Sequence, residues 1–519
     1  MPDTFSIDAD WNALYTDGKW TESDGDEEIS VQDPSTREEI ARVPAGSEAD
    51  VDAAFKAAAA AQAEWRETPP VERERVALDV ANLLQEYEAE IVDLLAHEAG
   101  GSRIMGETSV QIATDQAMEA ATLPRRMKGE QADSNVPGKE NLVRREPQGV
   151  VTVISPWNFP LNLSGRAVAP AIATGNAVVL KPASNTPITG GLLIAKLYEE
   201  AGLPDGLLNV VTGSGSDIGD AVVAHPESDV VAFTGSTPVG RGVATTGGEN
   251  LSVIALELGG NNGHIVTADA DLEAAVDSAV FGTFVHQGQV CISINRHIVH
   301  EDVYDEYVDR LTDRAESLPV GSAHDPETVV GPVIDESQRD EMLGYVQETV
   351  EAGATLETGG ETVPMDSAGD EGDENEGGDG NESGDDGKGD GDDSLLVAPT
   401  VLSGVTNDMA AACNEHFGPI APVISVSNVD EAVEVHNDTK YGLSGSVHAG
   451  DVGTGMQIAE RMETGMVHVN DQPVNDEAHV PFSGTKASGV GGYNGTDIMD
   501  EVTEKKWISL QHDRREYPF

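Results

Sequence analysis

The sequence predicts an α/β protein with a parallel, doubly wound sheet and a second, separate α/β domain. Three observations support this fold class. The chain has 519 residues, which is more than one hydrophobic core usually organises. Short β-branched runs alternate with helical stretches from about residue 142 to 260, as in a parallel sheet. A second alternating region covers about 270–352, and we expect the two to join near 257–260.

The elements of the first region follow from hydrophobic periodicity. Apolar residues recur at helical spacing in 49–63 and in 71–99, which predicts two consecutive amphipathic helices. Residues 142–154 then favour a strand. Helices are expected at 187–201 and 216–224, between the strand runs VVTVIS, NAVVLKP, LLNVVTG, VVAFTGS and LSVIALELGG.

The second region has the same alternation, followed by an unusual tract. We expect helices at 270–284, 304–317 and 336–352 and a strand at 296–300. Residues 365–393 consist of Gly, Asp, Glu, Asn and Ser without apolar periodicity, so they cannot bury enough surface to order themselves. We predict a solvated, mobile surface loop that supplies no catalytic residue.

The chain is strongly acidic. Its 93 Asp and Glu against 30 Lys and Arg give a formal net charge of −63, spread along the whole length. A dispersed acidic surface is typical of a protein kept hydrated at high salt, where screening limits self-repulsion. We therefore predict a halophilic source, and we expect neither nucleic acid nor an anionic membrane as a partner.

The cysteine content and the apolar runs predict a soluble cytoplasmic protein. Cys291 and Cys413 are too few for a disulfide framework, and no Cys/His spacing resembles a zinc site, so no metal is expected. The acidic first residues argue against a signal peptide. The longest apolar run, 167–180, contains Pro170 and Gly175 and does not fit a membrane span.

Six motifs together carry the functional prediction. A Gly-rich string at 213–219 follows a strand, but its spacing departs from the dinucleotide fingerprint. The stronger signal is an ordered set: PWNFP at 156–160, LKP at 180–182, FTGS at 233–236, LELGG at 256–260, GQVC at 288–291 and EHFGP at 415–419. In this order and spacing the set closely resembles the aldehyde dehydrogenase superfamily over nearly the whole chain except the acidic tract.

The resemblance implies three catalytic residues. Cys291 is the expected nucleophile, because a thiolate adds to an aldehyde, and the adduct can expel hydride and leave a thioester. Glu257 is the expected base for thioester hydrolysis. Asn158 and the Cys291 backbone amide are expected to stabilise the oxyanion. Cys413 has no motif of its own and is expected to be a small buried hydrophobic residue.

The resemblance also implies a nicotinamide cofactor. Lys181 and Glu415 are assigned to its two ribose regions, and Ser236, at a helix start, to the pyrophosphate. Trp157 and Phe417 are expected at the nicotinamide end. The remaining cofactor candidates are Ser184, Gly213, Phe233, Thr234, Gly235, Val239 and Leu258. Many NAD-preferring members have Glu where this chain has Ser184, so NADP as well as NAD is expected here.

The substrate prediction leaves two aldehyde classes open. The strings HQGQVCISINR at 286–296 and NDQPVNDEAHVPFSGTKASG at 470–489 look most like the benzaldehyde and vanillin dehydrogenase branch, which favours an aromatic aldehyde. Arg166 matches a position where succinate-semialdehyde dehydrogenases carry Arg, and could instead hold a substrate carboxylate. Phe159 and Ile292 are further substrate candidates.

Two other functions are weaker predictions. A CoA-acylating enzyme would not need the base that Glu257 supplies, and a non-catalytic binding protein would not need Cys291, Glu257 and Asn158 together. The resemblance implies two Rossmann-like domains and an oligomerisation segment that forms a homodimer or homotetramer. The expected boundaries are 1–123 with 148–258 for the dinucleotide-binding domain, 259–478 for the catalytic domain, and 124–147 with 479–519 for the oligomerisation segment.

Overall fold

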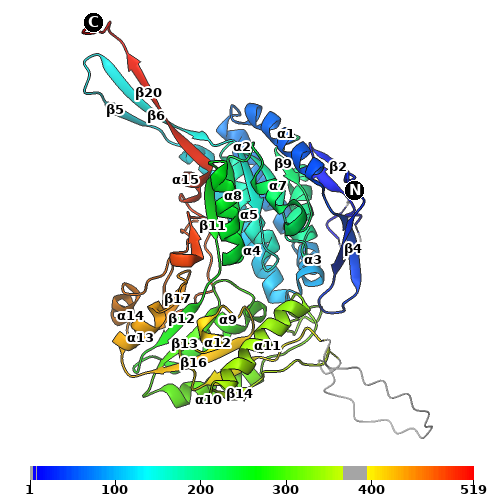
Figure 1. Ribbon diagram of the computed structural model, residues 1–519, viewed down its shortest axis with the longest axis vertical. Coiled ribbons are helices and arrows are strands. Elements are labelled where there is room, and N and C mark those ends of the chain that lie inside the picture. The colour runs from blue at the N-terminus through cyan, green and yellow to red at the C-terminus, as the bar shows by residue number, and fades with distance from the viewer. Residues whose placement is uncertain (1–3, 7–8, 366–393) are drawn as a thin grey trace, which may run out of the picture.

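The structure is a computed structural model that describes residues 4–6, 9–365 and 394–519 (Figure 1). The predicted acidic loop at 365–393 therefore lies, except for Met365, outside the described residues. Two α/β units lie one above the other in Figure 1, and a β arm extends away from them. No helix in the described ranges has both the length and the apolar character needed to span a membrane.

The larger sheet has eight strands in the order β19-β11-β10-β7-β8-β9-β1-β2. Its five central strands are parallel and were all predicted from their β-branched runs. Strands β7 and β8 are almost fully buried, as expected for a parallel sheet covered on both faces. The bounds are β1 Leu14–Thr16, β2 Lys19–Thr21, β7 Val150–Ile154, β8 Ala177–Lys181, β9 Leu208–Val210, β10 Val230–Thr234, β11 Val253–Glu257 and β19 Gly489–Val490.

Helices surround this sheet and bury the largest hydrophobic core of the described chain. Residues 187–201, predicted as one helix, form a π-helical turn η1 (Ile188–Leu192) that continues into α6 (Leu193–Glu200). The other helices of this unit are α1 Glu48–Trp65, α2 Pro70–Glu86, α3 Glu88–Ala99, α4 Arg103–Arg126, α5 Pro160–Ala173, α7 Gly215–Val223, α8 Thr237–Glu249 and α15 Ile498–Val502.

Two predicted elements are each divided in the structure. The expected helix at 71–99 is two helices, because Tyr87 leaves the helical conformation (φ −107°, ψ 25°) and its ring packs against Phe5 at 4.2 Å. The expected strand at 142–154 is β6 (Lys139–Pro147) followed by β7. The break contains Gly149 at φ 144°, where a Cβ would lie 2.0 Å from the Asp229 carboxylate, so only glycine fits there.

The second sheet has seven strands in the order β14-β15-β16-β13-β12-β17-β18. Its strands are β12 Asn262–Val266, β13 Ile294–His300, β14 Thr355–Thr358, β15 Thr400–Ser403, β16 Ile420–Val426, β17 Gly445–His448 and β18 His468–Val469. Its helices are α9 Leu272–Phe284, α10 Tyr304–Glu316, α11 Glu336–Glu351, α12 Ala410–Cys413, α13 Val429–Asn437 and α14 Val452–Ala459. The predicted α9, β13, α10 and α11 are confirmed within a few residues, as is the α/β fold class.

The β arm is a three-stranded antiparallel sheet in the order β20-β6-β5, with β5 at Glu130–Asp133 and β20 at Thr503–Gln511. It leaves the body of the molecule in Figure 1, and most of β20 and all of β5 are exposed. A separate hairpin, β3 (Glu28–Gln32) with β4 (Glu39–Pro44), lies along the N-terminal edge.

Candidate active site

The predicted motif residues meet at one edge of the larger sheet. Strands β8, β10 and β11 end at Lys181, Thr234 and Glu257, and the PWNFP loop follows β7. These strands are parallel neighbours, so their carboxyl ends share one edge. Open parallel sheets bind ligands at that edge. The structure therefore brings together residues that lie far apart in the sequence, from Pro156 to Glu257.

An unusual turn presents Cys291. The 3-10 helix η2 (Val285–Gly288) has positive φ at three successive residues, with His286 at 49°, Gln287 at 56° and Gly288 at 71°. The Gln287 amide holds the turn by donating to the carbonyls of Gly100 (3.1 Å) and Pro332 (2.7 Å). Strained turns of this kind persist only where the surroundings fix them, and they cluster at functional sites.

Asn262 and Gly260 support the same loop and were not predicted. The Asn262 side-chain amide donates to the carbonyls of Cys291 (2.9 Å) and Ser293 (2.7 Å). A Cβ on Gly260 would lie 2.2 Å from the Cys291 carbonyl oxygen, so the close approach requires glycine. Gly260 is the last residue of the LELGG motif and Asn262 lies two residues after it. That motif was the sequence signal from which both could have been predicted.

The Cys291 thiol is half-buried between charged groups of both signs. Its pKa is raised to about 12, mainly by burial; Arg166 acts in the opposite direction, and the nearby Glu415 and Glu257 carboxylates contribute to the rise. The resting residue is therefore a thiol, and the thiolate that reacts forms only when its proton is taken up.

Glu257 is a buried carboxyl group, 2% exposed, at the end of β11. Neither carboxylate oxygen has a hydrogen-bond partner in the described chain. Burial raises its pKa to about 8, Arg166 lowers it and Asp476 raises it. A carboxyl group that loses its proton near pH 8 can accept a proton from water.

Asn158 is buried in the loop between β7 and α5, and its side-chain amide donates to the Gln289 carbonyl at 2.9 Å. This bond uses one of the two N–H groups of the amide. The bond ties Asn158 to the loop that carries Cys291. The remaining N–H suits the oxyanion role that the sequence predicted.

A mostly apolar cavity opens beside Cys291. All three substrate candidates, Phe159, Arg166 and Ile292, line it together with Cys291 and Asn158. Sequence reasoning missed the remaining wall. Most of its residues come from α4, α5, α9 and the 474–482 segment. Val290 lies in GQVC, and the 474–482 residues lie in the 470–489 string, but neither string gave these residues a role. The residues of the remaining wall are Met105, Thr108, Ile112, Asn162, Leu163, Phe281, Val285, Val290, Val474, Asp476 and Phe482.

Arg166 is a buried cation in the wall of this cavity, 2% exposed on α5. Its guanidinium lies 4.2 Å from the Phe482 ring centroid and 5.1 Å from that of Tyr493. Its nearest carboxylate is Asp476 at 3.8 Å, and none of its nitrogens makes a hydrogen bond within the described residues. Aromatic faces and one carboxylate therefore already offset much of its charge.

The pyrophosphate candidate lies at an uncapped helix start. Ser236 is the N-cap residue of α8, and its side chain makes no capping hydrogen bond. The first-turn N–H groups of α8 therefore remain available to an anion. By contrast, α7, which follows Gly213, is capped by its own Ser214 through the Asp217 N–H. The geometry thus favours α8 over the Gly-rich string.

The other cofactor candidates adjoin this helix or the sheet edge. Lys181 is buried, and burial lowers its pKa to about 8. Its ammonium donates to the Pro182 carbonyl at 3.1 Å and has no carboxylate partner among the described residues. Ser184, three residues on, is half-buried. A buried cation with unused donors fits a polyhydroxylated or phosphorylated ribose.

Residues of α8 and of the adjoining strands form the rest of this surface. Phe233 and Leu258 are buried under α8, and a Cβ on Gly240 would lie 2.3 Å from the Leu258 side chain. The Gly235 N–H donates to the Glu257 carbonyl at 3.0 Å. Val239 is 55% exposed on the first helical turn, where an apolar contact is open to a ligand.

Glu415 and the two aromatic candidates close the opposite side. The Glu415 carboxylate accepts from the Gly260 N–H at 2.8 Å, and burial raises its pKa to about 7. The Trp157 and Phe417 rings meet edge to face at 5.6 Å. These residues, with Lys181 and the start of α8, fit a dinucleotide held along the sheet edge.

The expectation for Cys413 was wrong. Its side chain is exposed, because it occupies the last position of the one-turn helix α12 and lies on its outer side, while Ala411 and Ala412 pack into the core. Cys291 is therefore the thiol that belongs to the cavity.

The chain is similar to known proteins over nearly its whole length. Residues 20–373 and 370–508 match the aldehyde dehydrogenase family. The chain is 40% identical to a benzaldehyde dehydrogenase of Bacillus subtilis over 98% of this chain and 99% of that protein. It is 42% identical to a vanillin dehydrogenase of Corynebacterium glutamicum over 95% and 96% of the two chains. A betaine aldehyde dehydrogenase of Staphylococcus aureus, solved with NAD+, superposes with a TM-score of 0.91 at 31% identity over 98% and 96% of the two chains.

Proposed function

The chain belongs to the aldehyde dehydrogenase family, an NAD- or NADP-dependent class of enzymes, and from that premise we propose that it oxidises an aromatic aldehyde to the carboxylate. The observation that carries the substrate class is the apolar cavity at Cys291, whose wall includes Phe159, Phe281 and Phe482. A flat aromatic ring suits such a cavity, because it can pack against the three phenylalanine side chains. The names of the two similar proteins above agree with this class.

The reaction begins at Cys291. Its thiolate adds to the aldehyde carbon, and the carbonyl oxygen becomes an oxyanion. The second N–H of Asn158 and the Cys291 backbone N–H stabilise that oxyanion. Arg166 favours the thiolate, because its positive charge lowers the pKa of the Cys291 thiol.

NAD or NADP, held by Lys181, Glu415 and the start of α8, would supply the hydride acceptor that conversion of the adduct to a thioester on Cys291 requires. Glu257 then accepts a proton from water, whose oxygen attacks the thioester carbon. The carbon–sulfur bond breaks, the carboxylate leaves and the Cys291 sulfur regains a proton. Aldehyde, NAD(P)+ and water thus give carboxylate, NAD(P)H and two protons in solution.

A semialdehyde with a second carboxylate is the alternative substrate. It rests on Arg166, a buried cation in the cavity wall whose nitrogens make no hydrogen bond in the described chain. Asp476 and the rings of Phe482 and Tyr493 already surround that cation. A substrate carboxylate would approach Asp476 as well as Arg166, so we place this alternative second.

The cofactor and the assembly are also part of the proposal. Ser184 leaves no carboxylate at its position to repel a 2′-phosphate, so we expect NADP to be used as well as NAD. The exposed arm of β20, β6 and β5 offers an open sheet edge to a second copy, which supports a homodimer or homotetramer. The dispersed acidic charge supports function at high salt, and the two free cysteines fit a reducing cytoplasm.

The test is an initial-rate comparison in high salt. Benzaldehyde, vanillin and succinic semialdehyde are compared with NAD and with NADP, using the parent, Cys291→Ala and, as a matched thiol control, Cys413→Ala. We expect the aromatic aldehydes to give the higher kcat/KM, with activity lost only in Cys291→Ala. A preference for succinic semialdehyde would promote the alternative, and activity that survives in Cys291→Ala would refute the mechanism.

A further inference from the structure

Three side chains from distant parts of the chain meet outside the active site. Asp33 lies in the turn between β3 and β4, His97 in the last turn of α3, and His324 in the 322–325 turn that follows α10. One carboxylate or imidazole ligand atom of each lies within 4.8 Å of those of the other two. None of these residues belongs to a motif or to the cavity at Cys291.

The Asp33 carboxylate is held in place by its surroundings. It is 2% exposed, and one oxygen accepts from the Ser35 N–H at 2.7 Å. Its other oxygen accepts from Nε2 of His324 at 2.6 Å. A buried carboxylate needs a cation or several donors, and imidazole is its partner here.

The tautomer of His97 is fixed by a hydrogen bond. Its Nδ1 lies 2.8 Å from the Asp93 carbonyl oxygen, which can only accept, so Nδ1 carries the proton. The lone pair of the neutral ring is therefore on Nε2. Metal-binding histidines commonly donate Nδ1–H to a backbone carbonyl in this way, which leaves Nε2 free to bind the ion.

The two imidazole rings lie close enough to share one ion. Their centroids are 4.3 Å apart, and their side chains are 25% and 30% exposed, so both can rotate slightly. Ligand atoms around a tetrahedral zinc ion lie about 3.4 Å apart, given bonds of roughly 2.1 Å. Nε2 of His324 already lies 2.6 Å from the Asp33 carboxylate, so small rotations that move His324 slightly away from Asp33 and close the wider separations, up to 4.8 Å, produce that spacing.

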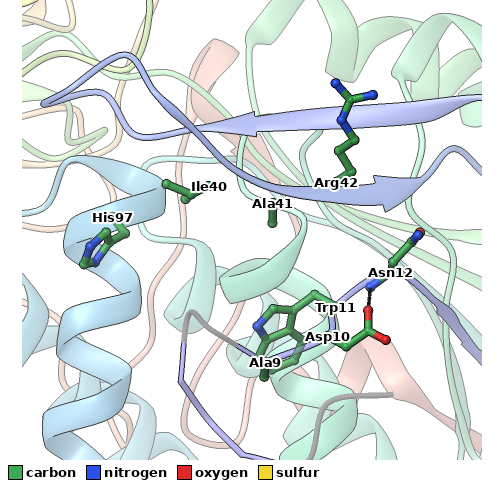
Figure 2. Close-up of a pocket in the computed structure, with 8 residues that line it drawn as sticks. All are labelled: Ala9, Asp10, Trp11, Asn12, Ile40, Ala41, Arg42 and His97. Carbon is green, nitrogen blue, oxygen red and sulfur yellow. Dashed lines mark hydrogen bonds between the residues drawn. The ribbon is translucent and has the colours of Figure 1, made fainter.

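We propose that Asp33, His97 and His324 form a binding site for one divalent transition-metal ion, with Zn2+ the best match. Two imidazoles and one carboxylate are a donor set that selects such ions over Mg2+ and Ca2+. A water molecule completes the shell, because the Asp93 carboxylate lies 3.6 Å from Nδ1 of His97 and so on the side of the ring that carries the proton. His97 also lines a surface hollow with residues 9–12 and 40–42 (Figure 2), which gives an ion access.

The site would join the two α/β units. Asp33 and His97 belong to the first unit and His324 to the second, and the Ala323 N–H already donates to the Ser35 hydroxyl at 3.0 Å. His97 is also three residues before Gly100, whose carbonyl accepts from the Gln287 amide in the turn that presents Cys291. A bound ion would therefore stabilise the contact between the units rather than take part in the reaction.

The experiment titrates the full-length protein with Co2+ and with Zn2+. Cys291→Ala/Cys413→Ala serves as the parent, so that no thiolate binds the ion, and excess Mg2+ occupies oxygen-only sites on the acidic surface. His97→Gln and His324→Asn are compared with His512→Asn, which removes an exposed histidine paired with a carboxylate, Glu140, at 3.1 Å. Metal-free thermal unfolding shows whether each variant is folded.

We expect one Co2+ per chain with the visible absorption of a low-coordinate site. The dissociation constant should rise at least tenfold in His97→Gln and in His324→Asn, and stay unchanged in His512→Asn. Zn2+ should raise the unfolding temperature of the parent and of His512→Asn but not of the other two. Equal Co2+ affinity in all variants, no visible band in the parent, or a Zn2+ shift that survives in His97→Gln would overturn the proposal.

Discussion

The substitution Glu257→Gln tests the assignment of the hydrolytic base. It keeps the shape of the side chain and removes its ability to accept a proton. Burial raises the pKa of Glu257 to about 8, so at pH 7 only about a tenth of the molecules have the carboxylate form. In the native enzyme, turnover limited by thioester hydrolysis should rise about tenfold per pH unit up to pH 8 and then level off.

The loss can be estimated from the role of the base. A positioned general base contributes about 10²- to 10⁴-fold, so kcat should fall by that factor at pH 8. Formation of the thioester does not use Glu257, and one equivalent of NAD(P)H should still appear in a rapid burst. Stopped-flow absorbance at several pH values measures both phases.

A matched control is Glu98→Gln. Glu98 is also buried, and burial also raises its pKa, to about 7. Its oxygens accept hydrogen bonds from the N–H groups of Ile188 and Thr189, and it does not line the cavity at Cys291. This variant should keep the rise of kcat toward pH 8. Steady-state turnover of Glu257→Gln at the native rate, or loss of its burst, would refute the assignment.

Three further substitutions test other parts of the site. Gly260→Ala should lower kcat/KM by on the order of 10²-fold, because its Cβ would displace the Cys291 carbonyl oxygen 2.2 Å away. The control is Gly242→Ala on α8, where a Cβ meets nothing within 4 Å; it should retain full activity in the same assay. Ser184→Glu should lower kcat/KM for NADP on the order of tenfold, through repulsion of the 2′-phosphate, while NAD is spared; equal effects on both would contradict the ribose assignment. Arg166→Met should cost about 1–3 kcal/mol in chemical unfolding, since it removes the cation beside the Asp476 carboxylate and leaves that group with the Asn494 amide as its partner. It should affect benzaldehyde and succinic semialdehyde alike; a loss specific to the semialdehyde would favour the alternative substrate.

The sequence was sufficient to predict the parallel sheet because its strands have continuous β-branched runs and every face is buried. Breaks inside a periodic segment were not predictable. Tyr87 ends α2 because its ring packs against Phe5, which is more than 80 residues away in the sequence. A single glycine such as Gly149 does not by itself predict the end of a strand. The structure shows why the chain needs glycine there, because the Asp229 carboxylate occupies the space of a Cβ.

The active site likewise contains residues that the sequence could predict and residues that it could not. Cys291, Glu257 and Asn158 lie in contiguous motifs, and the structure brings them to one sheet edge. Phe482 and Asp476 lie in the 470–489 string, but that string gave neither of them a role. Their place in the cavity wall beside Arg166 is visible only in the structure. The cluster that contains Asp33 and His324 could not be predicted either. These two residues are 291 positions apart, and zinc-site motifs are recognised from ligands that are close together in the sequence.

Direct detection of the thioester tests the central claim most closely. Glu257→Gln is mixed with benzaldehyde and NADP, quenched in acid, digested and examined by mass spectrometry, with Cys291→Ala as the control. The mechanism predicts one benzoyl group on the peptide that contains Cys291 and none in the control. A benzoyl group on the Cys413 peptide, or an unmodified Cys291 after NADPH has formed, would contradict it.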